Sequence, residues 1–461
     1  MMVDFKEFFK ATDPSKTLSV GDSELDRKYY IDFSSVRGGK IIEDLKNNIT
    51  LWSPEQPTCQ LLTGHIGCGK STELLRLKAE LEREGFHVVY FESSKDLEMG
   101  DVDVGDILLA IAKRVSESLD RLTLEEPKRL KSILQGAAKL LQTELEFDNF
   151  EIEALGNKVT ASKEGITVDA LGNQFSAGKE GITVVAMGIA KITAKVKHSP
   201  DLRSKLRGYL EPQTNGIIDA INKEILEPAI AKLKQHGKKG LVAIVDNLDR
   251  VDSSPKPWGR PQQEYLFVDR GEQLRSLHCH VVYTMPLALR FSNDFSTLIE
   301  RFISEPQVLP MVPVLCRDGS ENTEGMDLLR QMVLARAFPQ LEPEKRLEKI
   351  TTLFEDAQTL DRLCQISGGH IRYVIRILND GIKRQTGLPI ARQTLEDVIR
   401  AYRNERTLAI SDEEWELLRR VTERKQLPKK QDDHILIRSM FVYEYRDAAG
   451  SWFDINPILL A

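Results

Sequence analysis

One octapeptide organises this chain: Gly64-His65-Ile66-Gly67-Cys68-Gly69-Lys70-Ser71. An apolar run over residues 59–63 precedes it and predicts a buried strand, and residues 70–84 carry leucines along one side and predict a helix. In the spacing G-x-x-x-x-G-K-S, glycines allow backbone N–H groups to wrap closely around phosphates, and the helix start adds the positive end of its dipole. The octapeptide therefore predicts a loop that binds the phosphates of a nucleoside triphosphate.

Two side chains of this loop have distinct predicted tasks. Lys70 supplies a point charge to the outer phosphates, and the Ser71 hydroxyl offers an oxygen to Mg²⁺. ATP and Mg²⁺ are therefore the expected cofactors. The residues expected to bind the nucleotide are Gly64, His65, Ile66, Gly67, Cys68, Gly69, Lys70, Ser71 and Thr72.

A magnesium nucleotide site also needs a carboxylate at the carboxyl end of a neighbouring strand, because open α/β sheets bind their ligands there. Residues 241–245 are wholly apolar and lead into Asp246. We expect Asp246 to hold the Mg²⁺ shell, mostly through water, so Ser71 and Asp246 are the predicted metal residues. Asn247 stands where many ATPases carry the glutamate that orients the attacking water. Asp249 is the better candidate for that task, and the alternative for it is an acidic turn that caps a helix.

Three further residues occupy positions that suit contact with a γ-phosphate. Thr284 ends the next apolar strand, so its hydroxyl could sense the nucleotide; the alternative is an ordinary strand-end threonine. Arg301 lies just before the last predicted strand, where it could enter a neighbouring subunit as an arginine finger. Pairing with Glu300 or Glu305 on the surface is the alternative for Arg301. Arg372 starts a helix in the second domain and could close over the phosphates.

Composition and charge set the class of protein. At 461 residues the chain is too long for one core, so we expect two to four domains, and 41% hydrophobic and 29% charged residues are typical of soluble globular proteins. The net charge of -6 gives no global attraction for nucleic acid or an anionic membrane. The five cysteines lack the spacing of a disulfide framework or a zinc site. Without an apolar N-terminal signal core or a stretch of ~18 apolar residues, we expect a cytoplasmic protein that does not bind a membrane.

The order strand, phosphate loop, helix, strand predicts an α/β fold, with a P-loop NTPase parallel sheet and helices on both faces. We expect a lead-in over residues 1–58, an ATPase domain over 59–310, a helical lid over 311–403 and a winged-helix-like domain over 404–461. Residues 150–197 contain two copies of a 16-residue repeat, which predict a β-rich insertion or an extended arm. A duplicated surface hairpin without function is the alternative.

Together these residues resemble the AAA+ and STAND branch of P-loop ATPases, especially origin-recognition initiators and bacterial signal-transduction ATPases. The resemblance covers roughly residues 30–461 apart from the insertion, and residues 30–45 are similar to the family's lead-in, which packs near adenine. Asn247 departs from the family pattern and argues for slow turnover. The chain also ends at Ala461 without sensor repeats or an effector domain, so we expect any partner to be a separate protein. The matching elements are residues 64–71, Asp246, Leu248, Asp249, Thr284, Arg301, Phe302, residues 368–372 and the terminal winged helix.

The resemblance implies an ATP-hydrolysing switch whose nucleotide state controls homo-oligomerisation and a partner protein, a type found in prokaryotic conflict systems such as anti-phage defence. One alternative is a DNA-handling ATPase of the initiator or transposition-regulator type. Residues 401–461 contain 10 Lys and Arg against 11 Asp and Glu, a net charge of -1. Phosphate contacts dominate DNA affinity, so DNA is not favoured as a partner. Asn247 supports a second alternative, a nucleotide-binding scaffold with little or no hydrolysis.

Overall fold

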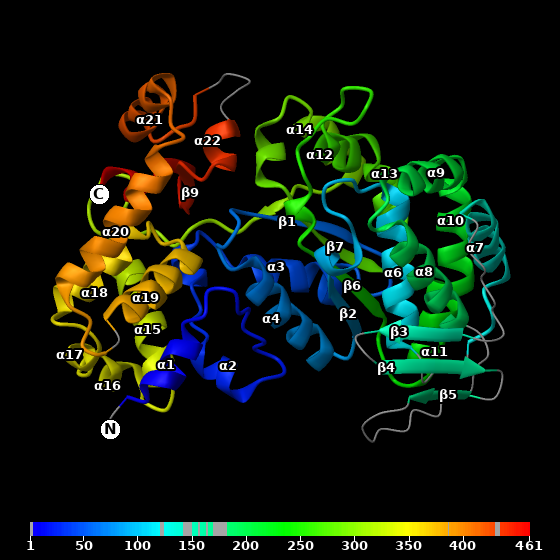
Figure 1. The fold of residues 1–461 in the computed structure, drawn as a ribbon, viewed down its shortest axis with the longest axis horizontal. Coiled ribbons are helices and arrows are strands. Elements are labelled where there is room, and N and C mark those ends of the chain that lie inside the picture. Colours follow the sequence, from blue (N-terminus) through cyan, green and yellow to red (C-terminus); the bar gives the residue numbers. More distant parts are fainter. Residues whose placement is uncertain are drawn as a thin grey trace.

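The computed structural model describes residues 3–119, 124–141, 150–154, 157–162, 165–168, 182–385, 387–428 and 434–461. Its centre is a five-stranded sheet with the strand order β2-β6-β7-β1-β8, in which every neighbouring pair is parallel. The predicted parallel sheet is confirmed, and the mixed α/β architecture is consistent with a P-loop NTPase fold (Figure 1). The strands are β1 (Cys59–Thr63), β2 (His87–Glu92), β6 (Leu241–Asp246), β7 (His280–Met285) and β8 (Gln307–Val308).

Helices cover both faces of this sheet because side chains alternate along each strand. Leu62 faces one hydrophobic core with α3 (Ile41–Asn47) and α4 (Lys70–Arg83). Leu61 faces the opposite core, which contains most of the helices between β2 and β6. Those helices are α6 (Val104–Ser118), α7 (Lys128–Leu140), α8 (Ile182–Val196), α9 (Pro200–Leu210), α10 (Thr214–Ala220) and α11 (Glu227–Gln235).

The repeat region is only partly β-structure. β3 (Phe150–Ala154), β4 (Asn157–Ser162) and β5 (Gly165–Val168) form a separate antiparallel sheet. From Ile182 onward the expectation of strands is wrong, because the chain forms α8, which packs against α6. Val185, Ile189 and Ile192 are buried at helical spacing, so the core they enter overrides the β-branched composition. Residues 169–181, which hold the second Ala-Leu-Gly-Asn copy, lie outside the described residues.

The first helices pack against the lid (Figure 1). Both α1 and α2 contact α15, and Phe8, Phe33 and Val36 share one hydrophobic core with the lid helices. The outer pocket wall described below is built from this shared core. The bounds are α1 (Phe5–Ala11), α2 (Glu24–Tyr29), α15 (Thr323–Ala337), α18 (Ala357–Ile366), α19 (Ile371–Gln385) and α20 (Arg392–Thr407).

The C-terminal elements follow the expected order of two helices and a hairpin. They are α21 (Asp412–Arg424), α22 (His434–Arg438), β9 (Val442–Asp447) and β10 (Gly450–Ile455). The hairpin does not project outward: Tyr443, Tyr445 and Trp452 are buried in the same core as α3 and α4. The backbone N–H of Met311, just after β8, donates to the Glu444 carbonyl at 2.9 Å.

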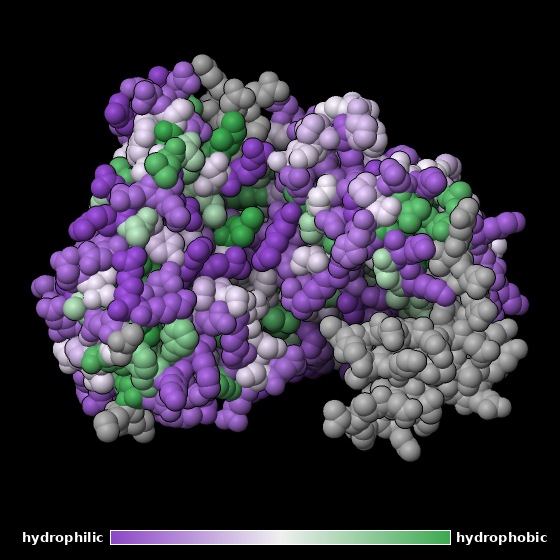
Figure 2. All heavy atoms as spheres, in the orientation of Figure 1, coloured by the Kyte–Doolittle hydropathy of each residue, from purple (hydrophilic) through white to green (hydrophobic). Residues whose placement is uncertain are grey.

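The visible face in Figure 2 is mostly hydrophilic, with small groups of hydrophobic residues between the polar ones. Among the described residues, no helix is both long and apolar enough to cross a membrane.

Gly369, in the turn between α18 and α19, leaves no room for a side chain. Its φ is +73°, and a Cβ there would lie 1.6 Å from the Val312 carbonyl oxygen. Gly369→Ala should therefore lower the free energy of unfolding by at least about 2 kcal/mol, because backbone must move. Gly387→Ala is the matched control, since its Cβ would meet nothing within 4 Å. Thermal unfolding of both variants checks this, and equal midpoints would contradict the described packing.

Candidate nucleotide-binding site

The phosphate loop connects β1 to α4 at the carboxyl edge of the sheet. Gly67 is required here for two reasons: its φ is +89°, and a Cβ would lie 2.5 Å from Cε1 of His370. The loop therefore contacts the lid directly. Helix α4 begins at Lys70, which directs its positive end toward the loop.

Lys70 is buried, and its charge is compensated within the site. Its ammonium donates to the carbonyls of Gly64 at 2.7 Å and His65 at 2.9 Å, and it lies 2.9 Å from Oδ2 of Asp249. Burial opposes the charged amine, but the surrounding groups, with the Asp249 carboxylate first among them, together outweigh burial and raise the pKa of Lys70 above its ordinary value. Oδ1 of Asp249 is buried without a hydrogen-bond partner in the described part of the chain, so this carboxylate has an acceptor position for a further donor.

Asp246 lies beside Ser71, as predicted for the magnesium pair. Its carboxylate accepts hydrogen bonds from the Tyr90 hydroxyl at 2.8 Å and the Asn247 backbone N–H at 2.7 Å, and it interacts with the Ser71 hydroxyl. Burial, and then the charge of Asp249, raise the pKa of Asp246. Within the described ranges, no group of three or more His, Cys, Asp or Glu could hold a metal by itself. A hydroxyl and one carboxylate fit Mg²⁺, which keeps several waters and takes other oxygens from phosphates.

The start of α19 closes the loop from the lid side. His370 lies 3.0 Å from the Ile66 carbonyl through Nε2, and its Nδ1 accepts from the Tyr373 N–H, so Nε2 carries the proton. Burial, and then Arg372, lower the pKa of His370 to about 3, so the ring is neutral at pH 7. The backbone N–H of Arg372 donates to the Gly67 carbonyl at 3.3 Å.

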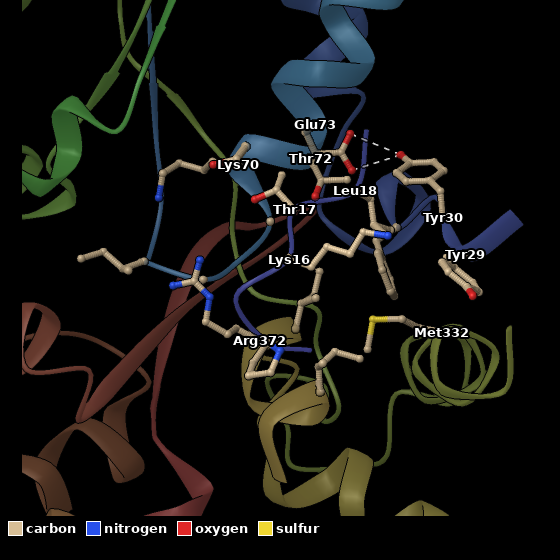
Figure 3. Close-up of a pocket in the computed structure, with 18 of the residues that line it drawn as sticks. Lys16, Thr17, Leu18, Tyr29, Tyr30, Lys70, Thr72, Glu73, Met332 and Arg372 are labelled. Carbon is tan, nitrogen blue, oxygen red and sulfur yellow. Dashed lines mark hydrogen bonds between the residues drawn. The ribbon is translucent and has the colours of Figure 1, made fainter. Parts of the chain in front are cut away.

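The Arg372 side chain reaches into the site, as predicted. Figure 3 shows it pointing from α19 toward the phosphate loop. Burial, and then the nearby charge of Arg250, lower the pKa of Arg372. Neither arginine has a salt-bridge partner among the residues the structure describes. Arg372 and Arg250 thus place two positive charges at the phosphate-loop end of the site, where a bound anion would compensate them.

A pocket of about 910 Å³ extends from the phosphate loop toward the N-terminal segment and the lid. At its outer end the Tyr30 hydroxyl donates to Glu73 at 3.1 Å, and burial raises the pKa of Glu73 (Figure 3). Arg336 closes this end from α15, where burial lowers its pKa to about 10. The other residues lining this outer end are Asp13, Pro14, Lys16, Thr17, Leu18, Tyr29, Ile31, Phe33, Met332 and Ile375.

Most of the predicted loop residues line this pocket, and three do not. The lining includes Ile66, Gly67, Gly69, Lys70, Ser71 and Thr72. Gly64 and His65 line a second pocket instead, and Cys68 is buried. Nε2 of His65 accepts from the Glu444 N–H at 2.9 Å, and the Cys68 carbonyl accepts from the buried guanidinium of Arg37 at 2.8 Å.

Thr284 and Arg301 do not line the pocket. The buried Thr284 hydroxyl accepts from the Leu248 N–H at 2.9 Å, so it positions the loop that carries Asp249. Arg301, on α14 (Phe295–Phe302), is half-exposed and pairs with Glu272. The observed partner of Arg301 is therefore Glu272, and not Glu300 or Glu305, the two partners expected from the sequence.

Sequence reasoning missed several residues of the site. Tyr90, which holds Asp246, is an ordinary strand residue by sequence, and no motif distinguishes Glu73 or Arg336. Asn247 adopts a left-handed conformation with φ 65°, and its amide donates toward Glu92 at 3.3 Å. A search for ionisable or aromatic residues near strand ends could have found Tyr90 and Glu92, but not the lid contacts.

No family model matches this chain, and a search of curated proteins finds no match. Among solved structures, the chain is similar to the ORC1 protein of Aeropyrum pernix, determined in complex with DNA. The identity is 12%, the alignment covers 90% of this chain and 88% of that chain, and the TM-score is 0.32. A likeness of that size adds nothing to the fold and site, which rest on this chain's own geometry.

Proposed function

We propose that this chain is a P-loop ATPase of the AAA+ and STAND type that binds Mg·ATP and acts as a nucleotide-controlled switch. One observation carries the proposal: the buried Lys70–Asp249 pair lies beside Ser71 and Asp246 at the carboxyl edge of the sheet, in one pocket with Arg372. Few other ligands would use a compensated lysine, a hydroxyl–carboxylate pair and an arginine in this arrangement.

The residues divide the work as follows. Lys70 and the loop N–H groups bind the outer phosphates, and Ser71 and Asp246 hold Mg²⁺, which neutralises charge on the phosphates when it is bound. The bound phosphate replaces Asp249 as the ion-pair partner of Lys70. Asp249 is then free to orient the attacking water. Arg372 stabilises charge on the transferring group.

Turnover is slow in this proposal because Asn247 cannot act as a base and its amide is directed to Glu92 and Ser94. The same residue supports the scaffold alternative, in which nucleotide binds without hydrolysis. The buried Tyr443, Tyr445 and Trp452 of the proposed winged helix give no support to DNA binding through its hairpin.

The switch would transmit the nucleotide state through contacts that the loop makes with both other parts of the chain. The lid contacts Ile66 and Gly67, and the C-terminal hairpin contacts His65. ATP would favour a homo-oligomer in which the half-exposed Arg301 completes a neighbour's site, and a separate protein, as in anti-phage defence, would respond.

The first test concerns ATP binding. Lys70→Ala removes the charge that faces the phosphates and should weaken ATP binding at least tenfold, about 1.4 kcal/mol or more. Lys78→Ala is the matched control, because Lys78 lies on the same helix but outside the pocket lining. Calorimetric titration measures both affinities. An unchanged affinity in Lys70→Ala would refute the nucleotide site.

The second test separates the two acids. Asp249→Asn keeps a side chain of the same shape beside Lys70, so it should bind Mg·ATP and lose hydrolysis. Asp246→Asn should also weaken binding that depends on Mg²⁺. Binding titrations with and without Mg²⁺, combined with steady-state ATPase rates, check both. Normal turnover in Asp249→Asn would remove Asp249 from the catalytic set, and a wild-type protein that binds but never hydrolyses would establish the scaffold alternative.

The third test asks whether the site is shared between subunits. Arg301→Ala should bind ATP normally but hydrolyse poorly, and mixing it with Lys70→Ala should restore some turnover, because that subunit still donates an intact Arg301. Size measurements in ATP accompany the rates. Normal hydrolysis by Arg301→Ala, or a wild-type monomer at every concentration, would leave Arg372 as the arginine acting within one chain; Arg372→Ala should then be the variant that loses turnover.

A further inference from the structure

A second pocket, of about 730 Å³, begins where the phosphate end of the first one stops. Ile66, Asp249 and Arg250 line both pockets, so Asp249 stands between them. The second pocket continues away from the lid, on the side of the loop that carries Gly64 and His65. Anything released from the γ-phosphate position therefore has this space next to it.

Three segments form the walls of the second pocket. They are the loop that follows β6, the turn that follows β7 and the C-terminal helix α22 with its flank. Nη1 of Arg438, on α22, donates to the Ser253 hydroxyl at 2.8 Å and so joins the first wall to the third. The residues of these walls are Val251, Asp252, Ser253, Pro286, Leu287, Ala288, Ile437, Arg438 and Met440, and Gln263 of α12 (Gln262–Glu264) also lines the pocket.

The charges along this pocket suit a small anion in transit. Arg250 lines both pockets and Arg438 lines the second, and neither has a salt bridge within the described ranges. Asp249 and Asp252 line the same pocket, so its two arginines are opposed by two acids and would bind a passing phosphate less strongly than two uncompensated cations. Arg250 also lies near enough to Arg372 to lower its pKa, which places Arg250 at the phosphate end.

We propose that the inorganic phosphate produced by hydrolysis leaves through this second pocket, and that α22 is its gate. The inference rests on the proposed ATPase activity. In the reaction the oxygen of water bonds to the γ-phosphorus, and the bond from that phosphorus to the bridging oxygen breaks. ADP keeps the bridging oxygen, and Asp249 takes the proton of the water and passes it to the departing phosphate. ADP still fills the first pocket, so phosphate has the second pocket as its free route.

Control by α22 follows from the Arg438–Ser253 hydrogen bond. While this bond holds, α22 and the loop after β6 narrow the pocket from two sides. A protein that fixes α22 in place would prolong the state that contains both ADP and phosphate, and one that displaces α22 would shorten it. The class of partner predicted here is one that binds the C-terminal helix pair.

Two filling variants test the route. Ala288→Trp and Gln263→Trp obstruct the pocket from different sides and leave the Arg438–Ser253 hydrogen bond in place. Ala288→Ser is the matched control that leaves the pocket open. Quenched-flow measurements follow cleavage in a single turnover, and a fluorescent phosphate-binding protein follows free phosphate. We expect cleavage within about twofold of wild type and phosphate release slowed at least about tenfold in both tryptophan variants. Release that keeps pace with cleavage in both variants would overturn the route.

A second pair of variants tests the gate. The same pair keeps the proposal testable if the tryptophan variants misfold. Arg438→Ala removes the hydrogen bond to Ser253 and should speed release at least about threefold, whereas Arg438→Lys keeps a donor and should change it less. If the tryptophan variants lose ATP affinity, the two Arg438 variants become the deciding test. An unchanged rate of phosphate release in Arg438→Ala then overturns the proposal. Absence of cleavage in the wild type would instead refute the ATPase activity itself, so the two failures are distinguishable.

Discussion

The buried ammonium of Lys70 imposes the constraint on which the site depends. Taking an ammonium out of water costs several kcal/mol unless charge and hydrogen bonds compensate it, and Asp249 with two loop carbonyls does so. These partners come from the loop after β1 and the loop after β6, so the pair fixes two parts of the sheet edge relative to one another. In the proposed function a bound triphosphate would replace the Asp249 carboxylate as the anion beside Lys70, so Lys70 would stay compensated in both states.

The loop around Lys70 is in turn held by segments far away in the sequence. His370 contacts Ile66 from the lid, and His65 accepts from Glu444 of the hairpin. The Glu444 carboxylate is buried and accepts from Arg290, just after β7, at 2.6 and 2.7 Å. Burial lowers the pKa of both histidines to about 3, so these contacts do not change with pH near neutrality. The phosphate loop is thus the point where the sheet, lid and hairpin meet.

The local sequence was sufficient to predict those elements that are determined by residues close together in the chain. The strand, loop and helix around residues 64–71, the strand into Asp246 and the bounds of α21 depend on neighbours in the chain, and these elements are confirmed. Arg372 was placed correctly because a helix start after a glycine turn restricts where it can point. The partners of Thr284 and Arg301, and the contact of Tyr30 with Glu73, join segments tens of residues apart, so no local pattern encodes them. At α8, burial against α6 overrode the β-branched composition that had suggested strands.

The shared core of the N-terminal helices and the lid determines which parts of the molecule move together. Phe8, Phe33 and Val36 pack with the lid helices, whereas the phosphate loop belongs to the sheet. The outer wall of the pocket therefore belongs to the part of the protein that contains the N-terminal helices and the lid, and the inner wall belongs to the sheet. The chain passes between these two parts near residues 37–40 and 309–312. We therefore expect the first 36 residues to move together with the lid when the pocket opens. A shortened protein that began at β1 would keep the lid but lose the core that α3 shares with α4 and the Tyr30–Glu73 hydrogen bond at the outer end of the pocket.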